Sequence, residues 1–522
     1  MTVTKGEILY YLFLILTMGA KGIGWTGGQK PFTICLAAAY LCLLLKMLLT
    51  DYKLKEWCLN AALLMMAAAV WRNSGETAAL AAVCTVIGMK NIPIQRIMRV
   101  ALAIWGSTFL FSVLRGVLGL GDGVVVVHSR LGLGPMIRYS LGYTHPNVLH
   151  VTYFVIVMLL LYVFPMQGKK LWAACGLLFL GNLYIFLYSM SYTGMIIVTF
   201  HLCLNLYFDM RRSLSGLEKI LLQCVAPFCI VFPIVGPLVI KGKLFAFFNK
   251  LLSTRFELVY FYFHEFQVSW FGTDTTYETE AHLTLDSSFA YLLMYYGIVA
   301  FVLLVAAYLM AIHREIKNGR FGGTGILIST ALAGVTEQFL FNLSFKNISL
   351  FWVGDYVYND LLERGGKNVW DKKLCFLPRQ SAPMEIPNLA RVWKQIRTEG
   401  KRVCWGKCMA WGILAAFLFL AVFQILWKMP ERVYVNRGMA DRFEGAFTVE
   451  EGQEWDRESS LYLGDMGPGE DVYELDGNIL IMERVRGSVS ALVWGMAAGM
   501  LVGAGWQTAH LMRRQNKSSC KK

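Results

Sequence analysis

The chain has 522 residues, of which 56% are hydrophobic and only 16% are charged. A soluble globular protein carries about a quarter charged residues, whereas this chain repeats apolar runs of the roughly 20 residues that cross a bilayer. The composition therefore excludes an ordinary soluble protein. The runs do not alternate polar and apolar residues, which also excludes a closed barrel and predicts an all-α polytopic integral membrane protein.

We predict about fourteen transmembrane helices. Twelve belong to a membrane core that spans residues 1–362, and no cleavage site follows the first apolar run, so this run is expected to stay in the membrane. The expected core spans are 8–20, 31–50, 57–71, 77–89, 100–118, 148–166, 171–190, 193–208, 220–240, 288–313, 324–345 and 348–358.

Basic residues predict the orientation. The connections 51–56, 90–99, 168–170, 209–219 and 314–320 all carry lysine or arginine, and all lie on one side if the N-terminus is cytoplasmic. The net charge of +14 is thereby assigned to cytoplasmic loops in a cell membrane rather than to nucleic-acid binding. Lys21 and Lys30 are the exceptions, because they fall on the opposite side.

The remainder of the chain differs in composition from the core. Residues 363–407 carry eleven basic and four acidic residues, and residues 428–487 carry fourteen acidic and seven basic residues. Apolar runs at 408–427 and 489–512 flank the acidic segment. We expect a basic cytoplasmic linker (363–407) and a two-helix membrane extension (408–522) with an acidic extracytoplasmic segment (428–487). Both termini then lie in the cytoplasm, and the acidic segment is expected to form a small or partly disordered module.

Cofactor signals are absent from the sequence. The twelve cysteines lie in apolar runs or basic segments, so no disulfide framework is expected outside the membrane. No cysteine or histidine spacing suggests a metal site, and no glycine-rich loop suggests a bound nucleotide. We therefore expect neither a cofactor nor a metal.

Four polar segments are placed on the outer face by this topology. They are the loop 119–147, the turn 189–194, the long loop 241–287 and a carboxylate inside the run 324–345. Their candidate binding and catalytic residues are Arg138, His145, Asn147, Ser191, Thr193, Arg255, Asp286 and Glu337.

Structural roles are open for each segment. The turn 189–194 could serve only close helix packing, Asp286 could cap the next helix, and Arg255 could reach lipid headgroups. A carboxylate in a span costs at least ~2.5 kcal/mol, so Glu337 needs a partner or a function.

Together these residue types suit one chemistry. Guanidinium groups bind phosphate or pyrophosphate through paired hydrogen bonds, and a histidine or carboxylate can take a proton from a sugar hydroxyl. Aromatic residues of the long loop, such as Phe261, Phe263 and Trp270, offer flat faces to sugar rings. The combination indicates glycosyl transfer from a lipid-pyrophosphate donor.

The order of these motifs resembles the Wzy-type polymerases of O-antigen, capsule and exopolysaccharide repeat units, within the O-antigen ligase-like group. Residues 138–147, Arg-Tyr-Ser-Leu-Gly-Tyr-Thr-His-Pro-Asn, are similar to that family's Arg-x-x-x-Gly-Phe/Tyr-x-His-Pro-Asn motif. Weaker similarities follow at 191–194 (Ser-Tyr-Thr-Gly), at Arg255 and 285–288 (Leu-Asp-Ser-Ser), and at 335–337 (Val-Thr-Glu). The resemblance covers about residues 1–360.

This resemblance implies a GT-C-like core. It implies transfer of a growing glycan from undecaprenyl pyrophosphate to the next lipid-linked repeat unit, outside the cytoplasmic membrane. Arg138 and Arg255 would hold the pyrophosphate, and His145 or Glu337 would orient or deprotonate the acceptor hydroxyl. Tyr192 stands where the family often has arginine, and the extension after residue 363 is not part of the usual core. The extension could contact a chain-length regulator or a flippase.

Three other functions remain open. A ligase that moves a finished glycan to a different acceptor would share the fold and the donor. A flippase or exporter of lipid-linked oligosaccharide would place charges at mid-membrane depth, whereas the polar groups here gather outside. A membrane scaffold would tolerate alanine at His145 or Arg255. The residues alone do not identify the sugar or the linkage.

Overall fold

A computed structural model describes residues 2–118, 120, 124–130, 134–211, 213–275, 285–341, 345–363, 369–374, 384–385, 404–427, 432–436, 447–448, 460–463, 472–475 and 478–519. These residues divide into two compact units. The first unit combines the N-terminal strand, residues 124–140 and the residues from 384 onward, and the second contains residues 4–123 and 141–383. The sequence placed 119–147 in one loop of the membrane core, whereas the structure assigns residues 124–140 to the unit that contains the C-terminal residues.

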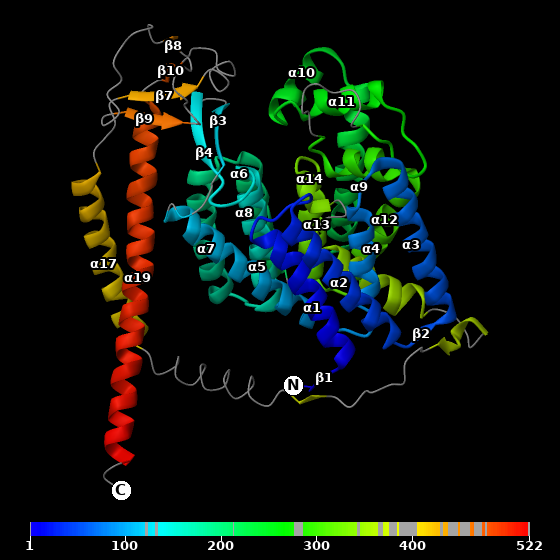
Figure 1. Ribbon diagram of the computed structural model, residues 1–522, viewed down its shortest axis with the longest axis horizontal. Coiled ribbons are helices and arrows are strands. Elements are labelled where there is room, and N and C mark those ends of the chain that lie inside the picture. Colours follow the sequence, from blue (N-terminus) through cyan, green and yellow to red (C-terminus); the bar gives the residue numbers. More distant parts are fainter. Residues whose placement is uncertain are drawn as a thin grey trace. The chain divides into compact units, whose positions relative to one another are not determined.

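The second unit is built mainly from helices (Figure 1). They are α1 (Lys5–Gly22), α2 (Lys30–Leu48), α3 (Leu54–Ser74), α4 (Ala78–Gly88), α5 (Ile94–Val117), α6 (Pro146–Val163), α7 (Lys169–Ser189), α8 (Tyr192–Arg211), α9 (Gly216–Val239), α10 (Gly242–Leu251), α11 (Arg255–Glu265), α12 (Ser288–Lys317), α13 (Phe321–Gly334), α14 (Gln338–Phe341) and α15 (Leu350–Tyr356). A π-helical turn (Val357–Leu361) and a 3₁₀ turn (Val369–Asp371) follow, and β2 (Tyr52–Lys53) pairs antiparallel with β5 (Lys373–Leu374).

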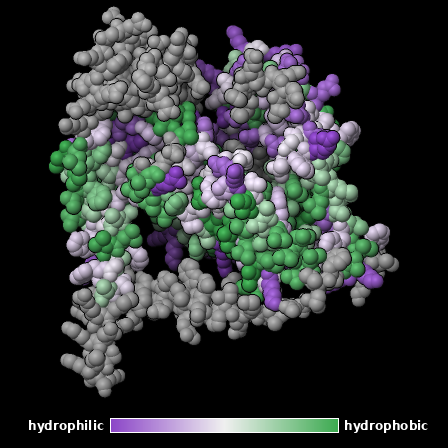
Figure 2. Space-filling view, in the orientation of Figure 1, coloured by the Kyte–Doolittle hydropathy of each residue, from purple (hydrophilic) through white to green (hydrophobic). Residues whose placement is uncertain are grey.

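Ten of the described helices are long and apolar enough to cross a membrane. They are α2, α3, α5, α6, α7, α8, α9, α12, α17 (Trp405–Leu426) and the Ile479–Ala509 part of α19 (Asn478–Ser519). Large hydrophobic side chains are exposed along them, including Leu41 on α2 and Leu177 on α7, and hydrophobic groups cover much of the visible helix surface (Figure 2). The chain is therefore mostly helical, as a multi-pass membrane protein is.

Four of the fourteen predicted spans are not among these ten helices. The run 8–20 lies in α1, which carries Lys5, Glu7 and Lys21. The runs 77–89 and 348–358 correspond to α4 and α15, which have 11 and 7 residues and are too short for a bilayer core of about 30 Å. The run 324–345, expected as one span, contains α13 and α14 with a break at residues 335–337.

The centre of the second unit is α6. Most of its residues are buried on every side of the helix, as expected for a helix that is hydrophobic all round. It begins at Pro146, since proline fits the first turn, where no intrahelical partner for its nitrogen is needed. The His-Pro-Asn motif therefore marks the start of the most buried of the ten candidate membrane spans.

A kink divides α12. Gly297 has a φ of +81°, and a Cβ there would overlap the backbone nitrogens of Phe271 and Gly272. The segment before α12 enters this kink and pairs with it, because Ile298 donates to the Ser269 carbonyl at 3.0 Å and Thr273 donates to the Met294 carbonyl at 3.0 Å. The kink thus fixes residues 269–273 of the long loop 241–287 beside the first half of α12.

Ion pairs gather at the opposite end of the second unit. Arg314 pairs with Asp355 at 2.6 Å and with Asp360, Lys90 pairs with Glu56, and Arg96 pairs with Glu7 at 3.0 Å. Arg314, Lys90, Arg96 and Glu56 lie in the connections that the charge pattern assigned to the cytoplasm. Their pairing satisfies charges at helix ends that would otherwise be costly near lipid.

The first unit contains a helical hairpin, a small sheet and a β-hairpin. Its elements are β1 (Thr2–Val3), β3 (Val125–Arg130), β4 (Gly134–Tyr139), β6 (Met384–Glu385), α17, β7 (Arg432–Asn436), β8 (Phe447–Thr448), β9 (Ser460–Leu463), β10 (Val472–Leu475) and α19. The strands β8-β10-β7-β9 form one sheet in that order, with β7 and β9 parallel. This sheet lies in the acidic segment 428–487, for which no regular strand spacing was seen in the sequence.

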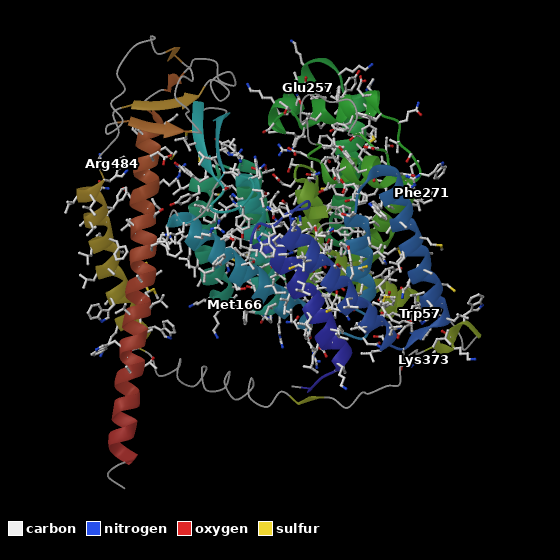
Figure 3. The ribbon with its side chains drawn as sticks, in the orientation of Figure 1. Trp57, Met166, Glu257, Phe271, Lys373 and Arg484 are labelled. Atoms are coloured by element: carbon white, nitrogen blue, oxygen red, sulfur yellow. The ribbon has the colours of Figure 1, made fainter. Side chains whose placement is uncertain are left out.

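Close backbone approach holds the hairpin of the first unit together. Gly495, Gly499 and Gly503 recur every fourth residue on α19 and face α17, which is the small-residue pattern of packed membrane helices. Gln424 of α17 also accepts a hydrogen bond from Arg484 of α19 at 3.0 Å (Figure 3). The β3–β4 hairpin joins the start of α19, since Arg486 donates to the Ile137 carbonyl at 2.9 Å and its guanidinium lies over the Tyr139 ring.

Candidate functional site

The break between α13 and α14 creates the central feature of the site. The helical bonds that the break interrupts are replaced by Ser288, the first residue of α12. Its single hydroxyl hydrogen is shared between the carbonyl oxygens of Glu337 and Gln338, which lie 2.5 Å and 2.8 Å from Oγ, and Oγ accepts from the Phe341 amide at 3.3 Å. Irregular backbone at membrane depth is tolerated where such partners satisfy it.

Arg255, the first residue of α11, reaches into this break. Its Nε donates to the Thr336 carbonyl oxygen at 2.7 Å, and its Nη1 donates to the Leu252 carbonyl oxygen at 3.0 Å. Its Nη2 lies 3.4 Å from a carboxylate oxygen of Asp286 and 3.7 Å from one of Glu337. The guanidinium is therefore directed at two carboxylates from different parts of the chain.

Burial separates the two carboxylates. The side chains of Arg255 and Glu337 are 9% and 4% exposed, whereas that of Asp286 is 36% exposed. Asp286 precedes Ser287, the N-cap of α12, which makes no side-chain capping bond. The geometry thus gives Asp286 an ion pair with Arg255 and leaves Glu337 as the enclosed partner.

The backbone that leads into α11 is strained. Ser253 and Thr254 have φ values of +52° and +67°, which residues other than glycine rarely adopt. These two residues form the turn between α10 and α11. Glu257 of α11 (Figure 3) accepts a hydrogen bond from Asn249 of α10 at 3.1 Å, which connects the two helices. Backbone strain of this kind persists where the surrounding structure imposes it, and it is concentrated at functional sites.

His145 is the N-cap of α6. Its Nδ1 accepts a hydrogen bond from the Asn147 amide at 3.1 Å. A ring nitrogen that accepts a hydrogen bond carries no proton, so the neutral imidazole holds its proton on Nε2. Asn147 supplies its backbone amide to this cap, and it follows Pro146 in the first turn of the helix.

The turn 189–194 contacts α6. Ser189 Oγ lies 2.9 Å from Nδ1 of the buried His150, and Asn182 Oδ1 lies 2.7 Å from its Nε2. A Cβ at Gly194 would overlap the His150 ring. Ser191 accepts from the Gly194 amide at 3.3 Å, and Thr193 is half-buried in the first turn of α8. The packing role that was left open for this turn is therefore present.

Arg138 lies on β4, opposite Val126 of β3. It belongs to the first unit, and the other seven predicted residues belong to the second. That Arg138 and Arg255 together hold a pyrophosphate stays a prediction. Within the second unit, the structure brings Arg255, Asp286 and Glu337 together from loops that are distant in sequence.

A cavity of about 360 Å³ adjoins this cluster through Gln338. Aromatic residues provide much of its wall, and the charged residues in the lining are Lys21, Lys346 and Glu76. The aromatic lining residues are Trp25, Phe32, Tyr40, Tyr143, Tyr291, Tyr296 and Phe345. The cavity is therefore both aromatic and charged, as sites for polar ring compounds are.

Lys346 connects the cavity electrostatically to the cluster. Burial and the neighbouring Lys21 lower the pKa of the Lys346 ammonium, the Glu337 carboxylate opposes this shift, and the resulting pKa is about 7. The ammonium also lies about 6 Å from the rings of Trp105 and Tyr143, within the range of cation–π attraction. The pKa of Lys346 thus depends in part on the charge of Glu337.

The sequence analysis missed Lys21, Lys346 and Glu76 as site residues. Lys21 did carry a signal, because it lay on the side opposite the other basic residues. Lys346 and Glu76 adjoin apolar runs and carried no motif that singled them out. Among the residues that the structure describes, no group of three or more histidine, cysteine, aspartate or glutamate side chains could hold a metal ion.

Comparison with protein-family models, curated proteins and solved structures found no match to this chain.

Proposed function

We propose that the chain is a membrane glycosyltransferase that polymerises lipid-linked oligosaccharide repeat units into a surface polysaccharide. The observation that carries this proposal is the meeting of Arg255, Asp286 and Glu337 beside a cavity lined by aromatic rings and lysines. The donor would be a glycan on undecaprenyl pyrophosphate, and the acceptor a hydroxyl of the next lipid-linked unit. The resemblance of residues 138–147, 191–194, 285–288 and 335–337 to Wzy-type polymerases supports the same function.

The transfer step needs a base, and Glu337 is the better candidate. In the proposed step, an acceptor oxygen bonds to the anomeric carbon, the bond from that carbon to the pyrophosphate oxygen breaks, and the acceptor proton moves to a carboxylate. His145 holds its ring proton on Nε2 while Nδ1 accepts from Asn147, so it suits donation to an oxygen rather than proton removal. We therefore assign Glu337 as the base and His145 as a positioning donor.

Arg255 would stabilise the departing pyrophosphate. Charge grows on the bridging oxygen as the bond to the anomeric carbon breaks, and a preorganised cation beside that oxygen lowers the barrier. Because its Nε and Nη1 are held by the carbonyl oxygens of Thr336 and Leu252, the guanidinium is already oriented before substrate binds. Asp286, the more exposed of its two partners, can yield its place to phosphate.

The proposal also includes the membrane topology, that is, which parts of the chain lie in the membrane and which lie on each side of it. We propose that about fourteen segments are embedded in the membrane, with the short helices α4 and α15 crossing only part of it. They would form a GT-C-like core with a two-helix extension, with both termini in the cytoplasm. The cluster of Arg255, Asp286 and Glu337 would lie on the outer face of a bacterial cell membrane. A fluorescent protein fused to the C-terminus should then fluoresce, whereas a periplasmic phosphatase at the same position should stay inactive. The reverse pattern would exclude a cytoplasmic C-terminus. The extension is proposed to meet chain-length or flippase partners.

Glycan length in cells tests the function. Cells without the native protein would be complemented with wild type, Arg255→Ala, Glu337→Gln or His145→Ala at matched membrane abundance, with Arg72→Ala as a control because Arg72 is exposed in the last turn of α3. Wild type and the control should restore long chains, and the three site variants should leave single lipid-linked repeat units.

Other outcomes would identify other functions. If wild type alters only where repeat units accumulate across the membrane, the protein is a transporter. If long chains form without it but fail to reach their final acceptor, it is a ligase. If Arg255→Ala and His145→Ala both restore full-length chains, the site assignment is wrong.

A further inference from the structure

The cavity beside Gln338 holds two lysines against aromatic rings. The Lys21 ammonium, at the end of α1, lies 4.6 Å from the centre of the Phe32 ring of α2. The Lys346 ammonium approaches Trp105 and Tyr143 from the chain that follows α14. Both lysines line the same cavity, and burial together with the charge of Lys21 lowers the pKa of Lys346. Such an arrangement favours an anion between them, because an anion would relieve the repulsion.

Other groups of the lining are suited to sugar hydroxyls. Glu76 accepts a hydrogen bond from the Tyr291 hydroxyl at 2.6 Å, and both residues line the cavity. The hydroxyl oxygen of Tyr40, also in the lining, is buried and has no hydrogen-bond partner in the part of the chain that the structure describes. A buried hydroxyl without a partner is costly, so a ligand group that bonds to it gains affinity.

We propose that this cavity is a subsite for an acidic sugar of the acceptor, with the sugar carboxylate between Lys21 and Lys346 and the sugar ring against the aromatic wall. The inference rests on the proposed function and narrows its substrate class to repeat units that contain a uronic acid or a related acidic sugar. The cavity volume of about 360 Å³ lies near the lower end of small-ligand pockets, which measure about 300–1,000 Å³, and suits one or two sugar rings.

A pyrophosphate is the other anion that two lysines could hold. Three features favour the carboxylate. The wall is aromatic, and the Glu76 carboxylate repels a pyrophosphate more strongly than a singly charged carboxylate. The cations of the cavity are lysines rather than the arginines that bind phosphate through paired bonds. Arg255 lies outside this lining, at the break in front of Glu337. An acceptor sugar in the cavity would thus lie apart from Arg255, the cation proposed for the leaving group.

The position of the cavity fits the acceptor. Gln338 lines it, and the preceding residue is Glu337, the proposed base. An acidic sugar held by Lys346 would therefore lie near the carboxylate that receives the acceptor proton. Lys21 and Lys346 become specificity-determining residues of the acceptor, while Arg255 acts on the donor.

Binding to the purified full-length protein in lipid nanodiscs tests this assignment without turnover. The probes are cellobiouronic acid, which carries a carboxylate, cellobiose, which replaces it with a neutral hydroxymethyl group, and inorganic pyrophosphate. Cellobiouronic acid should bind about ten-fold or more tightly than cellobiose, since only its carboxylate can accept charge-assisted hydrogen bonds from the two lysines. Lys21→Gln and Lys346→Gln should each remove most of this preference.

The control is Lys30→Gln, because Lys30 is exposed at the start of α2 and does not line the cavity. It should leave the affinity of all three probes unchanged. Equal binding of the acidic and neutral disaccharides by wild type would overturn the proposal, whether or not the lysine variants fold. Binding of pyrophosphate alone, lost in both lysine variants, would also overturn it and assign the cavity to the carrier.

The outcome is separable from that of the polymerase test. If cells show polymerisation but the purified protein does not distinguish the two disaccharides, the acceptor assignment fails and the proposed function stands. If cellobiouronic acid binds through the two lysines but no polymerisation is found, the acidic-sugar site stands and the proposed reaction fails.

Discussion

Arg255 donates a hydrogen bond through Nε to the carbonyl oxygen of Thr336 at 2.7 Å, although 81 residues separate them in the chain. The bond can form because the helix that α13 begins is interrupted at this point, which frees the carbonyl from its helical partner. The arginine therefore satisfies the backbone of the break and, through its Nη2, faces the buried Glu337 carboxylate. The same side chain therefore both supports the break and lies beside the carboxylate that is proposed as the base.

Removal of Arg255 should destabilise the protein through Glu337. In Arg255→Ala, the buried carboxylate loses its cation, and the loss of one partner of a buried pair costs about 3–5 kcal/mol. Adding Glu337→Gln removes the buried charge, so the double variant should unfold at a higher temperature than Arg255→Ala alone. Thermal unfolding of the purified variants, followed by tryptophan fluorescence, measures both effects. Purely additive losses would mean that the two side chains do not interact.

Gly194 should be intolerant of a side chain. A methyl group there would overlap the His150 ring, and overpacking of this kind costs about 1–3 kcal/mol. Gly176→Ala is a matched control, because Gly176 is exposed on α7 and a Cβ there has no heavy atom within 4 Å. It should raise stability by up to about 1 kcal/mol through helix propensity. We expect a lower midpoint of thermal unfolding for Gly194→Ala and not for Gly176→Ala. Equal midpoints for both would contradict the contact with His150.

The helices of the core follow from the sequence because long apolar runs leave few alternatives. Each of the fourteen predicted runs overlaps a helix of the structure, and the start of α6 at Pro146 follows from the fit of proline to a first helical turn. Ten of the helices reach the length and hydropathy of a membrane span. The break at residues 335–337 could not be foreseen, because the apolar run continues across it. Ser288 and Arg255, which are distant in sequence, form hydrogen bonds with the backbone of the break.

The candidate site was predicted only in part. The predicted topology placed Arg255, Asp286 and Glu337 on the outer face of the membrane. Their pairing follows a strained turn at Ser253–Thr254, which no local sequence pattern predicts. Lys21 appeared as an exception to the charge rule, and its place in a cavity supplies a physical reason for the exception. Lys346 lies in a short polar gap between apolar runs, where sequence offers no measure of burial. The β3–β4 hairpin around Arg138 was hidden in a segment expected to be a loop.

Lys346 should make stability depend on pH. Its pKa of about 7 lies below the pKa of 10.5 that an unfolded lysine has, so the folded state binds its proton less well. The cost of the charged group is therefore complete below pH 7, falls as pH rises from 7 to 10.5, and is absent above that range. Burial is the main cause of the low pKa of Lys346, Lys21 lowers this pKa further, and Glu337 raises it.

The variant Lys346→Met removes this cost. It should stabilise the protein by an amount on the order of a few kcal/mol at pH 6, and the gain should shrink toward pH 10. Lys30→Met, at an exposed position, should show no such trend. The check is the unfolding midpoint of both variants and wild type across this pH range. A gain that is the same at pH 6 and pH 10 would show that charge on Lys346 is not its source.

Glu76 should oppose the binding of an acidic sugar in the cavity. Its carboxylate shares the lining with Lys21 and Lys346, so it repels a ligand carboxylate that these lysines attract. The change Glu76→Gln removes this repulsion, while the amide oxygen can still accept from the Tyr291 hydroxyl, which lies 2.6 Å from a carboxylate oxygen in wild type. Cellobiouronic acid should then bind about three- to ten-fold more tightly, as expected for removing a like charge at a few ångströms in a medium of intermediate dielectric.

The neutral disaccharide separates electrostatics from hydrogen bonding in this prediction. Cellobiose carries no charge, so its affinity should be the same for wild type and Glu76→Gln. Titration calorimetry with both disaccharides, at low and high salt, provides the measurement, and the gain for the acidic sugar should decrease as salt screens the charges. If Glu76→Gln weakens both ligands alike, Glu76 accepts hydrogen bonds from sugar hydroxyls. The carboxylate of the ligand would then have to lie far from it, at the Lys346 end of the cavity.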